Sequence, residues 1–243
     1  MNNLVDAGKR VVLIANHTSH IDAAVLLSMI NSKVSYPIEK SRMKKWWLFP
    51  FRKIIKPLPV DPNNHMAIRA IINDLKQDKK VLLFPEGRTS TTGTLMKIYE
   101  SPGLIAMNSN AVVLPVRIEG TQYSFFSSAK GKFRTRLFPS FKITFLKPYK
   151  IEAPKNLSGR DRRQFASQKI FEIMSNMYFE STNHNKTLFE SLLEAQKSHG
   201  RNHKILGDKD TKPLTYQKLV LDSFTWSRRI RFLTQNEKNV GVI

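Results

Sequence analysis

Short apolar runs recur along this chain at intervals long enough to hold a helix, and this alternation constrains the fold more than any other feature. Residues 11–15, 81–84 and 111–118 are short runs rich in Val, Leu and Ile, which predict buried strands. Residues 64–77 instead place Ile and Leu at helical spacing, which predicts an amphipathic helix. The pattern indicates an α/β fold with a mostly parallel central sheet and helices on both faces.

The rest of the chain continues this alternation. The same criteria predict extended segments at 34–40, 58–62 and 141–146, and helices at 23–30, 103–108, 160–181 and 186–198. Because parallel strands end at one edge of a sheet, polar residues that follow successive strands should lie close together. We therefore expect one edge to gather five side chains, namely His17, Lys40, Asp61, Glu86 and Arg88.

The stretch Asn-His-Thr-Ser-His-Ile-Asp, residues 16–22, follows the first predicted strand and precedes a run of helical length. Asp22 stands at the position of a helix N-cap. His17 and Asp22 can meet only if the histidine lies in the turn and the aspartate begins the helix. The carboxylate would then hold one imidazole nitrogen and leave the other free as a base. The alternative is a surface histidine beside a capping aspartate.

A second motif, Phe-Pro-Glu-Gly-Arg-Thr-Ser, follows a later predicted strand and ends at Ser90. Gly87 permits a tight turn, and Arg88 provides a planar fork suited to phosphate. Thr89 and Ser90 add hydroxyl donors, and backbone amides at the start of a following helix would help to hold an anion. Glu86 is expected to orient Arg88 or a substrate hydroxyl. The alternative is an ordinary strand-to-loop turn with a surface ion pair.

Composition narrows the classes of function. The chain of 243 residues has a formal net charge of +21, so it should seek polyanions such as nucleic acid, an anionic membrane or an acidic protein. It has no cysteine, which excludes a disulfide framework, a thiol nucleophile and a cysteine metal site. Its apolar runs all fall short of the roughly 18 residues of a membrane span. A membrane is therefore expected only as a surface to lie on.

Two basic segments are candidates for contact with polyanions. Residues 44–53 set a run of apolar and aromatic residues between two basic pairs, which suits a membrane interface or, equally, the start of a core helix. Residues 130–136 place cations at alternate positions, so an extended backbone would put them on one face.

The motifs together resemble those of glycerophospholipid acyltransferases of the bacterial lysophosphatidic acid acyltransferase type. That family carries Asn-His-x4-Asp, a basic extended block, Phe-Pro-Glu-Gly-Thr-Arg-Ser and Val-x-Pro-Val, in this order. The matching segments here are 16–22, 57–61, 84–90 and 113–116. The third block reads Glu-Gly-Arg-Thr-Ser, which moves the arginine by one place.

The sequence is more closely similar to the bifunctional 2-acylglycerophosphoethanolamine acyltransferase/acyl-ACP synthetase, which has the same order in its third block. This resemblance implies an acyltransferase domain at 1–183, a connecting helix at 184–204 and the truncated start of an adenylate-forming acyl-ACP synthetase domain at 205–243. The Gly-rich Ser/Thr loop for ATP phosphate is missing, so we expect no adenylation by this chain. Asp61 is followed by Pro62, where lysophosphatidic acid enzymes often have arginine, and this favours a phosphodiester head group.

The resemblance implies a role for each site residue. His17 would be the general base and Asp22 would orient it, and the family spacing selects His17 over His20. The acceptor would be bound by Glu86, Gly87, Arg88, Thr89, Ser90 and Lys40.

The resemblance also implies partners and a location. The acyl donor would be acyl-ACP or acyl-CoA, with no cofactor and no metal. The partners would be a lysophospholipid, acyl carrier protein and an anionic membrane, and not nucleic acid. The chain would be peripheral on the cytoplasmic face of a bacterial inner membrane.

Three other functions remain open from the sequence. One is a lysophosphatidic acid acyltransferase of phospholipid biosynthesis. Another is a nucleic-acid-binding protein, which the charge permits although no zinc spacing, basic zipper or RNA-binding aromatic signature is present. The third is a protein that binds lipid without catalysis.

Overall fold

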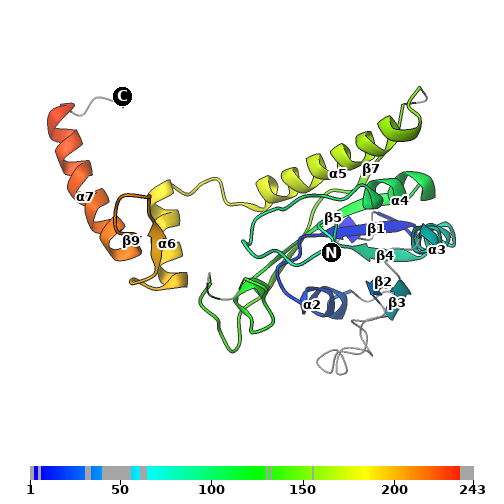
Figure 1. Ribbon diagram of the computed structural model, residues 1–243, viewed down its shortest axis with the longest axis horizontal. Helices are drawn as coiled ribbons and strands as arrows, with labels where there is room; N and C mark the ends of the chain where they lie inside the picture. Colours follow the sequence, from blue (N-terminus) through cyan, green and yellow to red (C-terminus); the bar gives the residue numbers. More distant parts are fainter. Residues whose placement is uncertain are drawn as a thin grey trace. The chain divides into compact units, whose positions relative to one another are not determined.

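The computed structural model describes residues 3–4, 7–30, 34–39, 56–60, 65–129, 131, 133–154 and 156–235 (Figure 1). By their contacts, the residues form two compact units, Met1–Thr182 and Asn183–Ile243. The larger unit contains the sheet and both sequence motifs.

The larger unit is built on one mixed sheet. Its strands are β1 (Val11–Ala15), β2 (Val34–Glu39), β3 (Lys56–Val60), β4 (Lys80–Leu83), β5 (Val112–Glu119), β6 (Lys142–Phe145) and β7 (Tyr149–Lys150). Over the described residues, this seven-stranded sheet has the order β3-β2-β4-β1-β5-β6, with β7 also paired to β5. Neighbours from β3 to β5 run parallel, whereas β6 and β7 run antiparallel to β5. The predicted mostly parallel sheet is confirmed.

The central strand β1 explains why its sequence is continuously apolar. All five of its residues are buried. The strand pairs with β4 on one side and β5 on the other, so that Leu13 lies between Leu82 and Leu114. A strand that is covered on both faces needs apolar residues at every position, not at alternate ones.

Helices cover both faces of the sheet, as predicted. They are α2 (Asp22–Ser28), α3 (His65–Lys76), α4 (Ser101–Ser109) and α5 (Gly159–Ser181). One core packs Leu75, Ile105 and Met174, from α3, α4 and α5, against the sheet. A second core packs Leu26 of α2 against the opposite face. Figure 1 shows α2 on one side of the sheet and α4 and α5 on the other.

Most predicted elements are present with ends shifted by a few residues, because helix and strand ends depend on tertiary contacts. Several predictions fall outside the part of the chain that the structure describes. They concern Lys40, Asp61, the basic and aromatic segment 44–53, and residues 130 and 132 of the basic segment 130–136. Arg134 and Arg136 of that segment are described and exposed, and they lie outside the named strands.

The smaller unit contains α6 (Leu188–His199), β8 (Lys204–Leu206), β9 (Leu214–Thr215) and α7 (Tyr216–Leu233). A capping box between Thr187 and Glu190 starts α6, and Phe189 of α6 contacts Phe224 of α7 edge to face, with ring centroids 5.0 Å apart. The predicted connecting helix thus packs within this unit. The assignment of residues 205–243 to a synthetase domain stays a prediction.

Among the described helices of both units, none combines the length and the apolar character needed to cross a membrane.

Candidate active site

The histidine turn begins at Asn16, whose side chain continues the sheet after the backbone of β1 has ended. Nδ2 of Asn16 donates to the Ile118 carbonyl at 2.8 Å, and Oδ1 accepts from the Ile118 amide at 2.8 Å. These two bonds fix the end of β1 to β5 and satisfy backbone groups of a buried strand. His17 therefore extends from a fixed point at the carboxyl end of the sheet.

The structure brings His17 and Asp22 into direct contact, with Nδ1 of the imidazole 2.9 Å from Oδ2 of the carboxylate. A carboxylate accepts hydrogen bonds, so Nδ1 carries the proton and Nε2 of the neutral ring keeps its lone pair. The ring stacks on Phe84, with centroids 4.0 Å apart and an angle of 17° between the planes. The histidine is thus held on two sides, in the orientation that a base requires.

Asp22 does not cap its helix, contrary to the prediction. The cap position of α2 is Ile21, and Asp22 is the first residue of the helix. Oδ2 of Asp22 turns back and accepts from the backbone amides of Thr18 at 2.7 Å and Ser19 at 2.8 Å. With the imidazole, three donors converge on this one buried oxygen. The carboxylate therefore stabilises the turn that holds His17, and orients the ring as well.

Glu86 lies in the loop after β4 and is almost completely buried, at 1% exposed. The predicted contact with Arg88 is replaced by two backbone contacts: Oε1 accepts from the His17 amide and Oε2 from the Met96 amide, each at 3.2 Å. Burial raises the pKa of Glu86, and these two hydrogen bonds oppose that rise. Glu86 thus joins the two motif loops, a contact between distant segments that the sequence does not reveal.

Gly87 and Arg88 form the exposed part of the second motif. Gly87 has φ +64°, and its amide donates to the Phe84 carbonyl at 2.9 Å, which confirms the predicted tight turn. A Cβ atom at this position would lie only 2.8 Å from Cε2 of Tyr99. Arg88 is exposed and lines the same pocket as His17.

Thr89 and Ser90 both make contacts within the protein, and for the buried Ser90 these contacts replace the predicted donation to a bound anion. The hydroxyl of Thr89 contacts the hydroxyl of Ser128. Ser90 is 1% exposed; its hydroxyl accepts from the Gly93 amide at 2.9 Å and donates to the Thr94 carbonyl at 3.0 Å. The predicted helix start is also absent from this loop, because the next helix, α4, begins only at Ser101.

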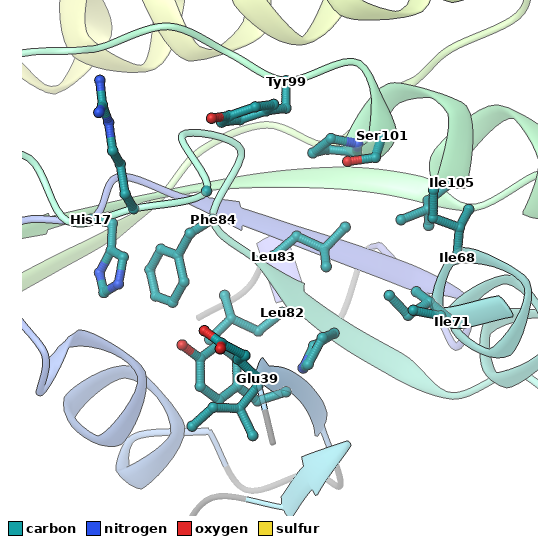
Figure 2. Close-up of a pocket in the computed structure, with 17 residues that line it drawn as sticks. His17, Glu39, Ile68, Ile71, Leu82, Leu83, Phe84, Tyr99, Ser101 and Ile105 are labelled. Carbon is teal, nitrogen blue, oxygen red and sulfur yellow. The ribbon is translucent and has the colours of Figure 1, made fainter. Parts of the chain in front are cut away.

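A pocket of about 570 Å³ opens beside the histidine and extends between the sheet and two helices. Figure 2 shows His17 and Phe84 at one end and Ile68, Ile71 and Ile105 at the other. The isoleucines come from α3 and α4, so the pocket becomes apolar as it leaves the histidine. A long apolar group with a polar, reactive end matches this gradient.

Comparisons with known proteins point to one family. Residues 2–119 match the family model described as Acyltransferase. The matched segment covers slightly less than half of the chain. It contains the histidine turn and the Glu86 loop, and it ends at the last residue of β5.

Two individual proteins are similar to this chain. A protein of Mycoplasma pneumoniae named a probable 1-acyl-sn-glycerol-3-phosphate acyltransferase is 24% identical over 121 residues. The alignment covers 46% of this chain and 46% of the relative, so the chain spans less than half the length of that protein. The crystal structure of the 1-acyl-sn-glycerophosphate (LPA) acyltransferase PlsC from Thermotoga maritima has 20% sequence identity and a TM-score of 0.51. The structural alignment covers 72% of this chain and 68% of the PlsC chain, and the likeness concerns the α/β fold.

The histidine turn is also held by a part of the chain that sequence reasoning missed. Thr121 and Ser124 follow β5, and their hydroxyls bond the hydroxyls of Thr18 at 3.0 Å and Ser19 at 2.9 Å. All four side chains are buried. No local pattern distinguishes such serines and threonines from those of an ordinary loop.

A half-buried pair of a basic and an aromatic side chain, Arg117 of β5 and Tyr178 of α5, lies close to this candidate site. The guanidinium carbon of Arg117 sits 3.9 Å above the ring of Tyr178. Burial raises the pKa of Tyr178, and the positive charge of Arg117 opposes that rise. The positive charge of Arg117 also lowers the pKa of Glu86, but burial raises that pKa by more. Among the described residues, no three His, Asp or Glu side chains are grouped as metal ligands would be.

Proposed function

We propose that this protein is a glycerophospholipid acyltransferase, which moves a fatty acyl group from an acyl thioester to the free hydroxyl of a lysophospholipid. The observation that supports this most directly is the 2.9 Å contact between Nδ1 of His17 and Oδ2 of Asp22, beside a pocket that becomes apolar away from the ring. The family match to residues 2–119 supports the same reaction class.

In the proposed reaction, His17 acts as general base and Asp22 as its orienting partner. The acceptor hydroxyl oxygen attacks the thioester carbonyl carbon while its proton passes to Nε2 of His17. The tetrahedral intermediate then collapses, the carbon–sulfur bond breaks, and the thiolate leaves with the proton from the imidazolium. The products are an ester and a thiol, so the reaction requires neither a covalent enzyme intermediate nor a cofactor.

The apolar pocket is the proposed site of the acyl chain. Ile68, Ile71 and Ile105 line its far end, where a hydrocarbon chain would leave water. The reactive carbonyl would then lie at the near end, beside His17. This arrangement places the thioester of the donor and the hydroxyl of the acceptor at one imidazole.

Arg88 is the proposed anchor of the acceptor phosphate, because it is exposed and shares the pocket with His17. The roles of Glu86 and Ser90 are revised: they hold the loop that carries Arg88, and Gly87 gives that loop its turn. Lys40 remains a proposed second anchor.

The finer identity of the substrates is also a proposal. The sequence resemblance favours 2-acylglycerophosphoethanolamine as acceptor and acyl-ACP as donor. Lysophosphatidic acid is the alternative acceptor and acyl-CoA the alternative donor. The net charge of +21 suits both an acidic carrier protein and an anionic membrane, in keeping with a peripheral location on the cytoplasmic face of a bacterial inner membrane.

Transfer of a labelled acyl group tests this function, with each donor supplied to each acceptor. His17→Ala should lower the rate by roughly 10²–10⁴-fold, the usual contribution of a positioned base. His20→Ala is the matched control and should retain most of the activity. Full activity of the His17→Ala protein, or loss confined to His20→Ala, would overturn the assignment.

A further inference from the structure

The chain between β5 and β6, residues 120–141, forms a lobe that contacts both motif loops; we call it the rim segment. It is described at 120–129, 131 and 133–141. Ser127 pairs with Ser19 of the histidine turn as an antiparallel bridge, and the Phe126 carbonyl accepts from the His20 amide at 3.1 Å. Figure 1 shows this green segment extending away from the sheet. One side of the lobe is thus attached to the catalytic turn.

The other side of the rim segment is attached to the loop of the second motif. Gly93 approaches Phe133 so closely that a Cβ on the glycine would lie 2.7 Å from Cζ of the ring. Phe133 in turn meets Tyr123 edge to face, with centroids 5.8 Å apart. The Arg136 amide donates to the Tyr123 carbonyl at 2.8 Å, which folds the segment back on itself. The lobe is therefore a fixed surface beside the proposed active site.

The rim segment buries several small polar side chains and exposes several large apolar ones. Its polar side chains Thr121, Ser124 and Ser127 are buried. Four of its large apolar side chains are exposed: Phe138 is 91% exposed, Leu137 73%, Phe125 56% and Phe141 42%. Several large apolar groups exposed on one segment mark a surface that is covered in use.

The charge of the rim segment indicates what covers it. Residues 120–141 contain two lysines and two arginines and no Asp or Glu. Arg134 and Arg136 are exposed on the same segment as the apolar side chains. Aromatic and aliphatic groups beside cations, with no anion among them, suit a surface that is anionic outside and hydrocarbon beneath.

We propose that the rim segment docks the protein on an anionic phospholipid surface. Phe125, Leu137, Phe138 and Phe141 enter the boundary between head groups and acyl chains, and Arg134 and Arg136 contact lipid phosphates. This inference extends the proposed function, since a lysophospholipid in the bilayer would then reach His17 beside the lobe. A nucleic acid would engage the arginines but would leave the exposed aliphatic Leu137 in water.

Flotation of the full chain with vesicles tests the docking without any catalysis. The vesicles contain phosphatidylcholine with or without phosphatidylglycerol. The double variant Leu137→Asp/Phe138→Asp should lower partition onto the anionic vesicles by at least about tenfold, because two inserted apolar groups are lost. Phe171→Asp is the matched control: Phe171 is 45% exposed on α5, away from the lobe in sequence, and its replacement should leave partition unchanged. Equal partition of the double variant and the native chain would overturn the proposal.

A charge variant separates the two parts of the surface. Arg134→Gln should lower partition by about fivefold, the effect of one cation near an anionic membrane. This loss should shrink as salt is added, whereas the loss from Leu137→Asp/Phe138→Asp should persist. Insensitivity of partition to both variants, with loss of transfer from acyl carrier protein, would overturn lipid docking and identify a protein partner instead.

An activity assay distinguishes failure of this proposal from failure of the proposed function. With a short-chain lysophospholipid dissolved as a monomer, the Leu137→Asp/Phe138→Asp protein should work as fast as the native chain. With the same head group in anionic vesicles it should be at least about tenfold slower, in line with its lost partition. Equal loss in both assays overturns docking, whereas absence of transfer by the native chain in both overturns the acyltransferase itself.

Discussion

The loops that follow β1 and β4 both reach the proposed active site, but they are built in different ways. In the histidine turn, the reactive side chain and the groups that hold it are buried together, and Asp22 contacts both the imidazole and the backbone. In the loop after β4, two buried residues enclose exposed ones: Glu86 and Ser90 are inside, whereas Gly87 and Arg88 are exposed. In the histidine turn, the reactive residue and the residues that hold it therefore form one buried group. In the loop after β4, different residues hold the loop and face the pocket.

We expect the largest effect on activity from a substitution in the histidine turn. Asp22→Asn keeps an oxygen for the amides of Thr18 and Ser19 but removes the negative charge beside His17. We expect kcat to fall by about 10²–10⁴-fold, the range for a general base that has lost its orientation. The measurement is acyl transfer at saturating donor, with circular dichroism to confirm the fold.

Asp78→Asn is the control for this change, because Asp78 pairs with Arg10 on the surface at 3.0 Å. It should transfer acyl groups at the native rate. Native kcat in the folded Asp22→Asn protein would show that Asp22 holds the backbone of the turn but is not needed to orient His17 for catalysis.

The next effect concerns stability in the second loop. Glu86→Ala removes the acceptor for the amides of His17 and Met96, which are then left without this partner. We expect the free energy of unfolding to fall by about 2–4 kcal/mol, since each unsatisfied buried donor costs roughly 1–3 kcal/mol. Urea denaturation measures this. Glu100→Ala, at an exposed ion pair with Arg163, should change little. Similar stabilities for the two variants would contradict the structural role of Glu86.

A change at the exposed position of the same loop should affect binding and leave stability unchanged. Arg88→Ala should raise KM for the lysophospholipid by about 10–100-fold, which corresponds to the loss of a charge-assisted contact of roughly 1.5–3 kcal/mol. Its free energy of unfolding should match that of the native chain, because Arg88 is exposed. Arg160→Ala on α5 is the control for loss of one surface cation. A fall in stability with unchanged KM would reverse the assignment of roles within the loop.

The smallest effect is a dependence of stability on pH. Because burial raises the pKa of Glu86 above 4.5, the folded chain holds this proton more tightly than the unfolded chain does. The stability that it contributes is therefore complete below the unfolded pKa and is lost as the pH rises through the folded pKa. As the pH rises from below 4.5 through the folded pKa, the native chain should lose stability relative to Glu86→Gln, which does not titrate.

Glu172 provides a control, because its contribution to stability should change with pH in the opposite direction. A hydrogen bond from Lys169 lowers the pKa of Glu172, so its contribution is present at neutral pH and is lost as the pH falls through the folded value. The native chain should therefore gain stability relative to Glu172→Gln over the same rise in pH. Urea titrations of the native chain and the two variants at several pH values measure both trends. If the free energy of unfolding of the native chain minus that of Glu86→Gln stays constant or increases as the pH rises, the predicted effect of burial is contradicted.

The sequence predicts those features that depend on local pattern. The apolar runs of β1, β4 and β5 and the helical spacing in α3 identify the sheet and its cover, because period and length determine each element type. The meeting of His17 and Asp22 was predictable for a related reason: both lie at one strand-to-helix turn, so a short loop determines their distance.

The sequence does not predict contacts between segments that meet only in the folded chain. The bond of Glu86 to the His17 amide joins the ends of two neighbouring strands, and the string Glu-Gly-Arg suggested a local ion pair instead. Ser90 has an ordinary hydroxyl, and only the turn at 90–94 makes it an acceptor for backbone amides. For Asp22, the cap position is filled by Ile21, because the carboxylate satisfies donors before the helix and not within it.

The side chain of Asn16 should slow local opening of the backbone at the end of β5. Its amide group imitates one more residue of β1 and protects the Ile118 amide, which faces a loop and not a strand at that point. In hydrogen–deuterium exchange, Ile118 should therefore be as slow as the centre of β5, and Asn16→Ala should make this one amide exchange quickly. The rigid part of the protein then extends one residue past the end of its central strand, up to the backbone of the histidine.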